Sequence, residues 1–158
     1  MEADEPTDTP TPGLTIEPDQ CWVLLRSEAY GRLAVISEDG PDIFPINVQV
    51  DHGTLVFRTA AGSKLAALHD DPRVAFEVDG YDRDTRTAWS VVIRGTAKVV
   101  SDQYEAVEVV EIGVTPWQHG PKPEFVRIEP VTVSGRRFER SHRSDWSVPD
   151  VRRTTSVD

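Results

Sequence analysis

Short apolar runs divided by tight-turn sequences occupy residues 31–59, and they most constrain what this chain can fold into. The runs cover residues 31–37, 43–50 and 54–59, and the turn sequences between them are Glu38-Asp39-Gly40-Pro41 and Asp51-His52-Gly53. Clusters of aspartate, glycine and proline between strand-like runs are typical of β-hairpins. The pattern therefore predicts three antiparallel strands that follow one another in chain order.

Further strand-like runs extend the predicted sheet toward the C-terminus. They cover residues 73–79, 89–100 and 125–138. We expect the second of these runs to bend at Gly95. We expect the strand that contains Pro45 to be irregular or at a sheet edge, because proline cannot donate a ladder hydrogen bond. Six or seven mostly antiparallel strands predict a mainly β fold, a β-barrel with a few helices outside it, since closure removes exposed strand edges.

Three short helices and two tails complete the predicted organisation. The helices are expected at about 17–28, at about 63–70 and from residue 101 or 102 to about 111. Residues 1–14 are rich in proline, threonine and acidic side chains, which predicts a disordered tail. The domain is therefore expected to span 15–139, and residues 140–158 are expected to form a flexible C-terminal tail.

Composition excludes several classes of function. The formal net charge of −10 disfavours nucleic-acid binding, because phosphate backbones attract basic surfaces. No apolar run approaches the ~18 residues of a membrane span and the N-terminus does not resemble a secretory signal, so we expect a cytoplasmic protein without a membrane partner. Cys21 is the one cysteine, which excludes an intramolecular disulfide and indicates a core residue.

A strand that leads through a small-residue turn into a helix is the strongest candidate for a binding site. The strand ends in Arg58 and Thr59, the turn contains Gly62, and the helix opens with Ser63 and Lys64. Backbone N–H groups at a helix start attract anions, and two cations with two hydroxyl groups would add charge-assisted hydrogen bonds. The segment is suited to one phosphate monoester. The plain alternative is that Ser63 caps an ordinary helix and both cations are solvated.

Other reactive residues form no recognisable constellation. The histidines and acidic residues lack the spacing of a metal site, so no metal is predicted. Ser90 follows Trp89 but lacks the Gly-x-Ser-x-Gly context of a hydrolase nucleophile, and no base is placed by the sequence. A hydrolase is therefore disfavoured, and no catalytic residue is assigned.

Several motifs in a fixed order carry a family resemblance over about residues 15–139. They are Gly31-Arg32-Leu33-Ala34, Phe44-Pro45-Ile46-Asn47, Phe57-Arg58-Thr59, Gly62-Ser63-Lys64-Leu65, Phe76-Glu77-Val78-Asp79, Trp89-Ser90-Val91 and Val126-Arg127-Ile128. In this order they resemble the pyridoxamine 5′-phosphate oxidase-like family of FMN-binding split barrels. More narrowly, the chain resembles the small actinobacterial flavin or deazaflavin oxidoreductases and the nitroimidazole-resistance-type proteins. Motifs in series are more specific than any one of them.

The resemblance implies a split-barrel homodimer with two flavin sites at the subunit interface. By position in the family pattern, the FMN phosphate would be held by Arg58, Thr59, Ser63 and Lys64. The isoalloxazine ring would lie along Pro45, Ile46 and Asn47. The ring or the ribityl chain would be approached, from the opposite subunit, by Trp89 and Ser90. Flavin would supply the electron chemistry, so no catalytic triad is needed.

The function that this resemblance implies is an FMN-binding oxidoreductase. It would transfer electrons or hydride between a reduced donor and a small oxidised acceptor. Arg58 and Lys64 do not distinguish FMN from coenzyme F420, so an F420-dependent reductase of the same fold stays open. A non-catalytic flavin or haem carrier or sensor is the third reading, and haem would require a histidine as axial ligand. The C-terminal arginines do not match the substrate-phosphate motif of the full-length oxidase, so oxidation of pyridoxamine phosphate is not predicted.

Overall fold

The computed structural model describes residues 13–28, 30–101 and 124–139 of the chain. Its elements in chain order are β1 (Leu14–Ile16), α1 (Pro18–Ser27), β2 (Tyr30–Ser37), β3 (Gly40–Asn47), β4 (Gln49–Asp51), β5 (Thr54–Thr59), α2 (Ser63–Asp70), β6 (Arg73–Asp82), β7 (Thr87–Val99) and β8 (Glu124–Glu139). Two of the three expected helices are thus confirmed. The third, near residues 101–111, falls almost wholly outside the described residues, as do most of the two predicted tails. Within the described ranges, no helix is long and apolar enough to cross a bilayer.

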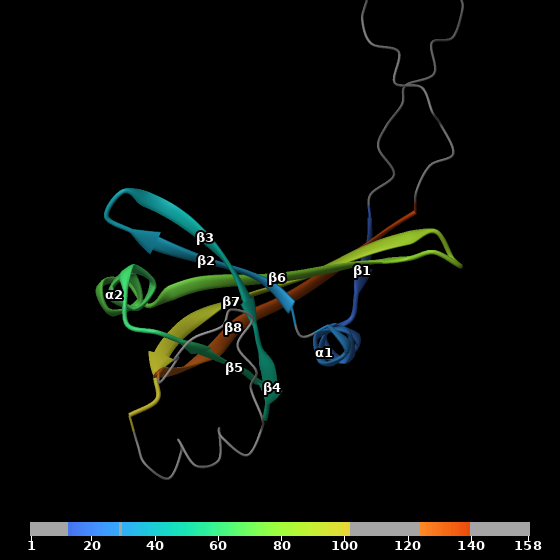
Figure 1. Cartoon of the computed structure of the whole chain (residues 1–158). Coiled ribbons are helices and arrows are strands. Elements are labelled where there is room, and N and C mark those ends of the chain that lie inside the picture. The colour runs from blue at the N-terminus through green and yellow to red at the C-terminus, as the bar shows by residue number, and fades with distance from the viewer. Residues whose placement is uncertain (1–12, 29, 102–123, 140–158) are drawn as a thin grey trace, which may run out of the picture.

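One antiparallel sheet contains all eight strands. Its order is β3-β2-β6-β7-β8-β5-β4, and β1 pairs with the C-terminal half of β8. Figure 1 shows that this sheet curls around its own axis. Within the described residues, neighbours along this order are paired, but β3 and β4, at its two ends, do not pair with each other. The fold is therefore a split barrel, as predicted.

The strand boundaries differ from the sequence prediction in two places. The run at 43–50 divides at Val48 into β3 and β4, so one predicted strand forms both ends of the sheet. Pro45 lies on β3, an edge strand that pairs with β2 alone, as its missing N–H requires. The bend at Gly95 is confirmed by a register shift between Arg94 and Gly95. β1 was not predicted, because three residues are too few to show a period.

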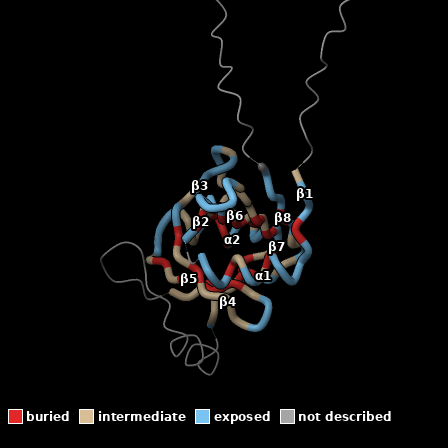
Figure 2. Tube along the Cα trace, turned by 90° about the vertical axis from the view of Figure 1, so that its right-hand side faces the viewer, coloured by how far each residue is buried: buried red, intermediate tan, exposed pale blue. Residues whose placement is uncertain are grey.

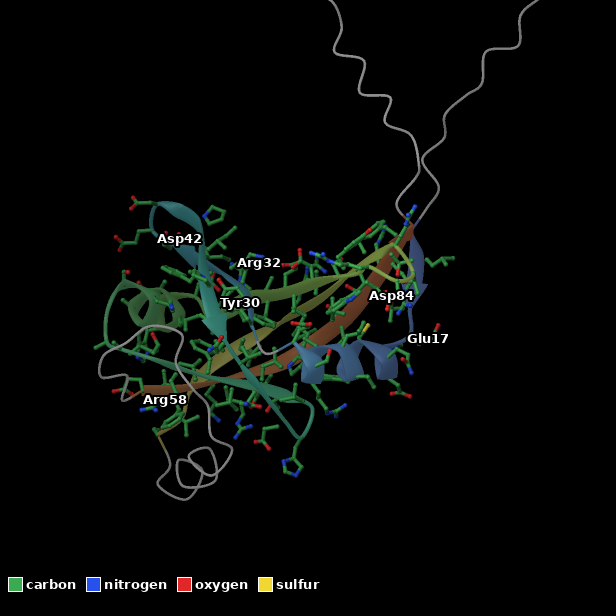
Figure 3. The ribbon with its side chains drawn as sticks, turned by 45° about the vertical axis from the view of Figure 1, so that its right-hand side comes forward. Glu17, Tyr30, Arg32, Asp42, Arg58 and Asp84 are labelled. Carbon is green, nitrogen blue, oxygen red and sulfur yellow. The ribbon has the colours of Figure 1, made fainter. Side chains whose placement is uncertain are left out.

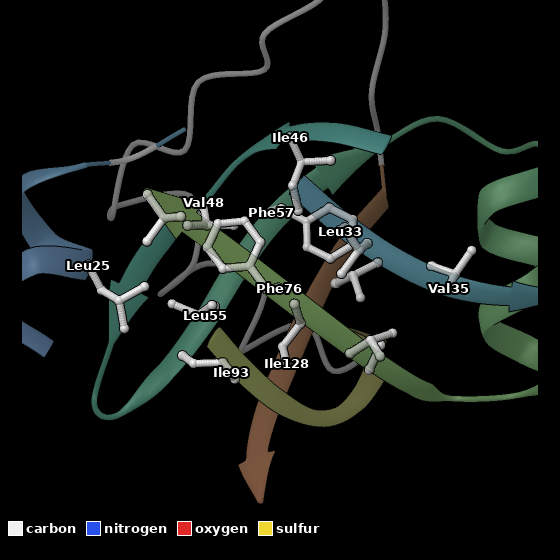
Figure 4. Packing of buried hydrophobic residues seen from close by; sticks show 14 of the residues in the cluster. Leu25, Leu33, Val35, Ile46, Val48, Leu55, Phe57, Phe76, Ile93 and Ile128 are labelled. Atoms are coloured by element: carbon white, nitrogen blue, oxygen red, sulfur yellow. The ribbon is translucent and has the colours of Figure 1, made fainter. Parts of the chain in front are cut away.

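The core fills the inner side of the curled sheet (Figure 2). Alternate side chains of the strands point inward, and Phe57 and Phe76 are fully buried among them, as the close view in Figure 4 shows. Both helices add to this same cluster, α1 through Cys21 and Leu25 and α2 through Ala67 and Leu68. Cys21 is thus the predicted core residue, and burial raises the pKa of its thiol.

A nearly buried ion pair fastens β4 to β8 across β5. Arg127 Nη1 donates to Asp51 Oδ2 and to Thr54 Oγ1, each at 2.7 Å. The side chains of Arg127 and Asp51 are only 12% and 14% exposed. The hydrogen bond from Arg127 is the main reason that the pKa of Asp51 lies below its usual value, and the neighbouring His52 adds to the effect. Asp51 therefore stabilises the fold in its ionised form.

We predict that Asp51→Asn lowers the free energy of unfolding at pH 7 by about 1–3 kcal/mol, because a charge-assisted hydrogen bond is weakened. The contribution of Asp51 is complete above the unfolded-state pKa near 4 and is lost as pH falls through the lower folded-state pKa. Urea unfolding at pH 7 and at pH 3 should therefore show a smaller difference for the variant than for the wild type. Asp39→Asn, at an exposed turn carboxylate, is the control. Equal pH dependence in all three proteins would contradict the prediction.

Candidate anion-binding site

The first turn of α2 presents backbone donors to solvent. Ala66 N–H donates to the Gly62 carbonyl at 3.0 Å, which closes the first helical turn. No side chain caps this end, and its first turn contains no acidic residue. The N–H groups that precede the first helical bond have no partner within the helix, and the helix dipole is positive here. Gly62 and Ser63 are exposed, so an anion could approach.

Arg58 stands at the end of β5, just before this turn. Its guanidinium carbon lies 5.1 Å from the centre of the Phe125 ring, and Phe125 is its cross-strand partner on β8. A cation over an aromatic face is attracted to the ring electrons, so Phe125 helps to orient the guanidinium. Figure 3 shows Arg58 near the end of the molecule that carries α2.

Lys64 connects the start of α2 with β3. Its Nζ lies 4.7 Å from the centre of the Phe44 ring. Phe44 immediately precedes Pro45 on β3. The structure therefore brings the segment around Ser63 and Lys64 close to the segment Pro45–Asn47, although about twenty residues separate them along the chain. One residue of the predicted phosphate group, Lys64, thus lies beside the residue that precedes the predicted ring segment.

Thr59 occupies a different position from Arg58. Its side chain is 3% exposed, and its Oγ1 donates to the Ala60 carbonyl at 3.3 Å. Consecutive strand residues point to opposite faces, so the Thr59 hydroxyl and the Arg58 guanidinium do not share a face. The period-two alternation of a strand predicts this division from the sequence alone.

The same alternation divides the segment Pro45–Asn47. Ile46 is 4% exposed and packs in the core, whereas Pro45 and Asn47 lie on the outward face of β3. Pro45 and Asn47 stand opposite Arg32 and Tyr30 of β2. A ligand on the outward face would meet the side chains of Pro45 and Asn47, and Ile46 would offer its backbone only.

Trp89 and Ser90 lie apart from this group. The C-terminal end of β7 lies beside the part of β8 that contains Phe125, and Phe125 in turn pairs with Arg58 of β5. Ser90 is nine residues from that end of β7, a strand length of roughly 30 Å. In Figure 3, Arg58 and Asp84, at the tip of the β6–β7 hairpin, lie toward opposite ends of the molecule. Trp89 and Ser90 also face opposite sides: an added Cβ on Gly80 would lie 2.5 Å from Trp89 Cε2, whereas Ser90 stands between Asp79 and Arg136.

A charged cluster beside Pro45 was not found from the sequence. Arg32 Nε donates to Glu77 Oε2 at 2.9 Å, and Arg32 Nη2 donates to Asp79 Oδ1 at 2.7 Å. These carboxylates, Asp79 foremost, raise the pKa of Arg32 above its already high value. Alternation predicts that Glu77 and Asp79 share a face, but only the register of β2 against β6 brings Arg32 to them. Within the described part of the chain, no group of three or more metal-ligating side chains is present.

Comparisons with known proteins agree with this architecture. The family model described as pyridoxamine 5′-phosphate oxidase matches residues 17–137. An uncharacterized protein of Mycobacterium tuberculosis is 31% identical over 134 residues, 82% of this chain and 88% of that protein. The solved structure of an FAD binding protein from Mycobacterium smegmatis is 35% identical, with a TM-score of 0.68, over 80% of this chain and 98% of that chain.

A second solved structure extends the agreement to another genus. A conserved protein of unknown function from Corynebacterium diphtheriae is 37% identical, with a TM-score of 0.69, and the match covers 82% of this chain and all of that one (100%). The family model alone spans most of the domain from α1 to β8. The resemblance inferred from the ordered motifs is thus confirmed, and this chain belongs to the pyridoxamine 5′-phosphate oxidase family.

Proposed function

We propose that this protein is a cytoplasmic, FMN-binding oxidoreductase that passes electrons or hydride between a reduced donor and a small oxidised acceptor. The observation that carries the proposal is the uncapped start of α2, with Arg58 before it and Lys64 within it. The Mycobacterium smegmatis relative, at 35% identity, is itself named as an FAD binding protein, which supports a flavin here. Bound flavin would supply the two-electron chemistry.

The residues of the chain would bind and orient the flavin. Its phosphate would be held by the N–H groups in the first turn of α2, by the Ser63 hydroxyl and by the charges of Arg58 and Lys64. The contact of Lys64 with Phe44 fixes this end of α2 against β3, so a ring could lie along Pro45–Asn47. β3 is an edge strand, so on one side its backbone N–H and C=O groups pair with no neighbouring strand among the described residues. Such groups could form hydrogen bonds with the heteroatoms of the ring.

Assembly as a homodimer is part of the proposal. Trp89 and Ser90 were assigned to the same flavin, yet roughly 30 Å of β7 separates Ser90 from the Arg58 end of the sheet. That separation exceeds the length of one flavin mononucleotide. A second copy could bring the part of its β7 that contains Trp89 and Ser90 to the flavin that the first copy holds by its phosphate, and the Ser90 side chain would be the one on the outward face. A two-fold arrangement would then create two equivalent sites.

The cofactor proposal predicts a yellow protein that binds FMN. The visible spectrum of the purified chain should show a bound flavin, or titration with FMN should produce a saturable change in flavin fluorescence. FAD, coenzyme F420 and haem, titrated separately, are the comparison. Tight binding of F420 or FAD with no FMN binding would replace the cofactor and keep the anion site. Haem binding alone, or no binding at all, would overturn the proposal.

Turnover separates an oxidoreductase from a carrier. We expect the FMN-loaded protein to be reduced by a nicotinamide donor, or by reduced F420, and to be reoxidised by a small acceptor over many cycles. Bleaching and recovery of the visible flavin absorbance measure the two half-reactions. Flavin that binds but undergoes no catalysed reduction by either donor would favour the carrier or sensor function.

Removing one phosphate ligand should weaken FMN binding specifically. Lys64→Ala should reduce FMN affinity by about 1–3 kcal/mol, because a charge-assisted contact to phosphate is lost. Riboflavin, which lacks the phosphate, should bind the variant and the wild type equally. Arg26→Ala, in the exposed last turn of α1, is the matched control. If Lys64→Ala lowered riboflavin and FMN affinity by the same factor, Lys64 would not contact phosphate.

A further inference from the structure

Three charged residues form a cluster on the outward face of the sheet, beside the segment proposed to lie along the flavin ring. Arg32 of β2 stands directly opposite Pro45 of β3, and Glu77 of β6 stands opposite Arg32. Asp79, two residues after Glu77, stands opposite Ser90 of β7. Facing residues of an antiparallel pair have Cβ atoms about 4.5–5.5 Å apart. The cluster of Arg32, Glu77 and Asp79 therefore extends across the face from Pro45 to Ser90.

The two carboxylates hold one edge of the Arg32 guanidinium. Arg32 Nε donates to Glu77 Oε2 at 2.9 Å, and Arg32 Nη2 lies 2.6 Å from the same oxygen and 2.7 Å from Asp79 Oδ1. Arg32 Nη1 donates to no residue among those that the structure describes. The guanidinium is planar and its donors keep a fixed arrangement. The Nη1 donors consequently point away from the edge that the carboxylates occupy.

Arg32 is the charged group of the cluster nearest to the proposed ring segment. It lies on the strand next to β3, whereas Glu77 and Asp79 lie one strand further, roughly 5 Å more distant. The side chains of Arg32, Glu77 and Asp79 are 42%, 32% and 60% exposed, so a ligand can reach them and water screens their charges only in part. In Figure 3, Arg32 lies on the sheet away from both helices.

Charge beside a flavin ring changes how readily the ring accepts electrons. A hydride from a reduced nicotinamide donor brings two electrons and one proton, so the ring gains one negative charge and loses it again when hydride passes to the acceptor. A cation near the ring stabilises the reduced form, and a carboxylate destabilises it. One cation in front of two carboxylates therefore combines opposing effects on the same equilibrium.

We propose that Arg32, oriented by Glu77 and Asp79, sets the balance between reduced and oxidised flavin in this protein. The guanidinium stabilises the reduced ring, and the two carboxylates limit that stabilisation while they hold the guanidinium in place. Arg32 is a specificity-determining residue for the electron donor and acceptor, and Glu77 and Asp79 are positioning residues. The inference rests on the proposed function, because it requires a flavin along Pro45–Asn47.

Two substitutions should change this balance in opposite directions. Arg32→Gln removes the cation and should weaken the binding of reduced FMN, relative to oxidised FMN, by about fivefold to tenfold. Asp79→Asn keeps an oxygen that accepts from Arg32 but loses the negative charge, so it should strengthen the binding of reduced FMN, relative to oxidised FMN, by about twofold to fivefold. Tenfold corresponds to about 30 mV in the potential of a two-electron couple. Fluorescence titration gives the dissociation constant of oxidised FMN, and anaerobic equilibration with a redox dye gives the potential.

Matched variants separate a local effect from a change in net charge. Arg26→Gln and Asp39→Asn remove the same charges at an exposed helix end and an exposed turn, and they should leave the potential unchanged. Arg32→Lys keeps the charge but lacks the planar fork that reaches both carboxylates, so its potential should lie between those of the wild type and Arg32→Gln. Thermal unfolding shows which variants fold. Because Asp79→Asn is isosteric, it tests the proposal even if Arg32→Gln does not fold.

The outcomes distinguish the inference from the proposed function. A wild type that binds FMN, with unchanged potentials in Arg32→Gln and Asp79→Asn or with shifts in the same direction, would overturn the inference alone. Equal shifts in Arg26→Gln and Asp39→Asn would do the same, because the effect would then come from net charge. A wild type that binds no FMN would overturn the proposed function, and the inference with it.

Discussion

The close approach of β2 to β6 is the contact on which much of the structure depends. Three register pairs join these strands, and an added Cβ on Gly31 would collide with the Glu77 carbonyl and the Phe76 ring. Glycine is therefore required there for proximity. The β2–β3 hairpin, and with it Pro45–Asn47, joins the rest of the barrel through this short ladder. Arg32, which follows Gly31, reinforces it with two carboxylate contacts.

Contacts between charged side chains and rings or carboxylates also connect other elements of the fold. Arg58 lies over Phe125 and Lys64 lies over Phe44, so two aromatic rings position the cations that flank the start of α2. On the other side of the barrel, Arg127 and Asp51 tie β4 to β8. Each contact joins elements that are distant in sequence or in sheet order. The anion site consequently sits on a frame set by long-range pairing.

Local signals in the sequence predicted the elements well. Turn residues and period-two runs gave most of the strands, and Ser63-Lys64 gave the start of α2. The partners Arg32–Glu77 and Arg127–Asp51 are 45 and 76 residues apart, and no local pattern specifies their register. The alternation of side chains along a strand, which the sequence shows, predicts that Arg58 and Thr59 point to opposite faces, and so do Trp89 and Ser90. The motifs grouped residues that are adjacent in the sequence, but adjacent residues of a strand point to opposite faces of the sheet.

Phosphate recognition at α2 is common to several cofactors, so discrimination among them depends on groups beyond the phosphate. On the outward face of the sheet, Pro45 and Asn47 of β3 lie beside Arg32 and Tyr30 of β2. These two residues lie on the outward face of the sheet, beside the edge strand along which the ring is proposed to lie. An interface that buries Arg32 and Tyr30 would remove water from the same region that a flavin ring would occupy, and it would strengthen the polar contacts made there. Subunit assembly and choice of cofactor would then depend on one surface, since a change in the fit of the two sheets alters the space left for the ring.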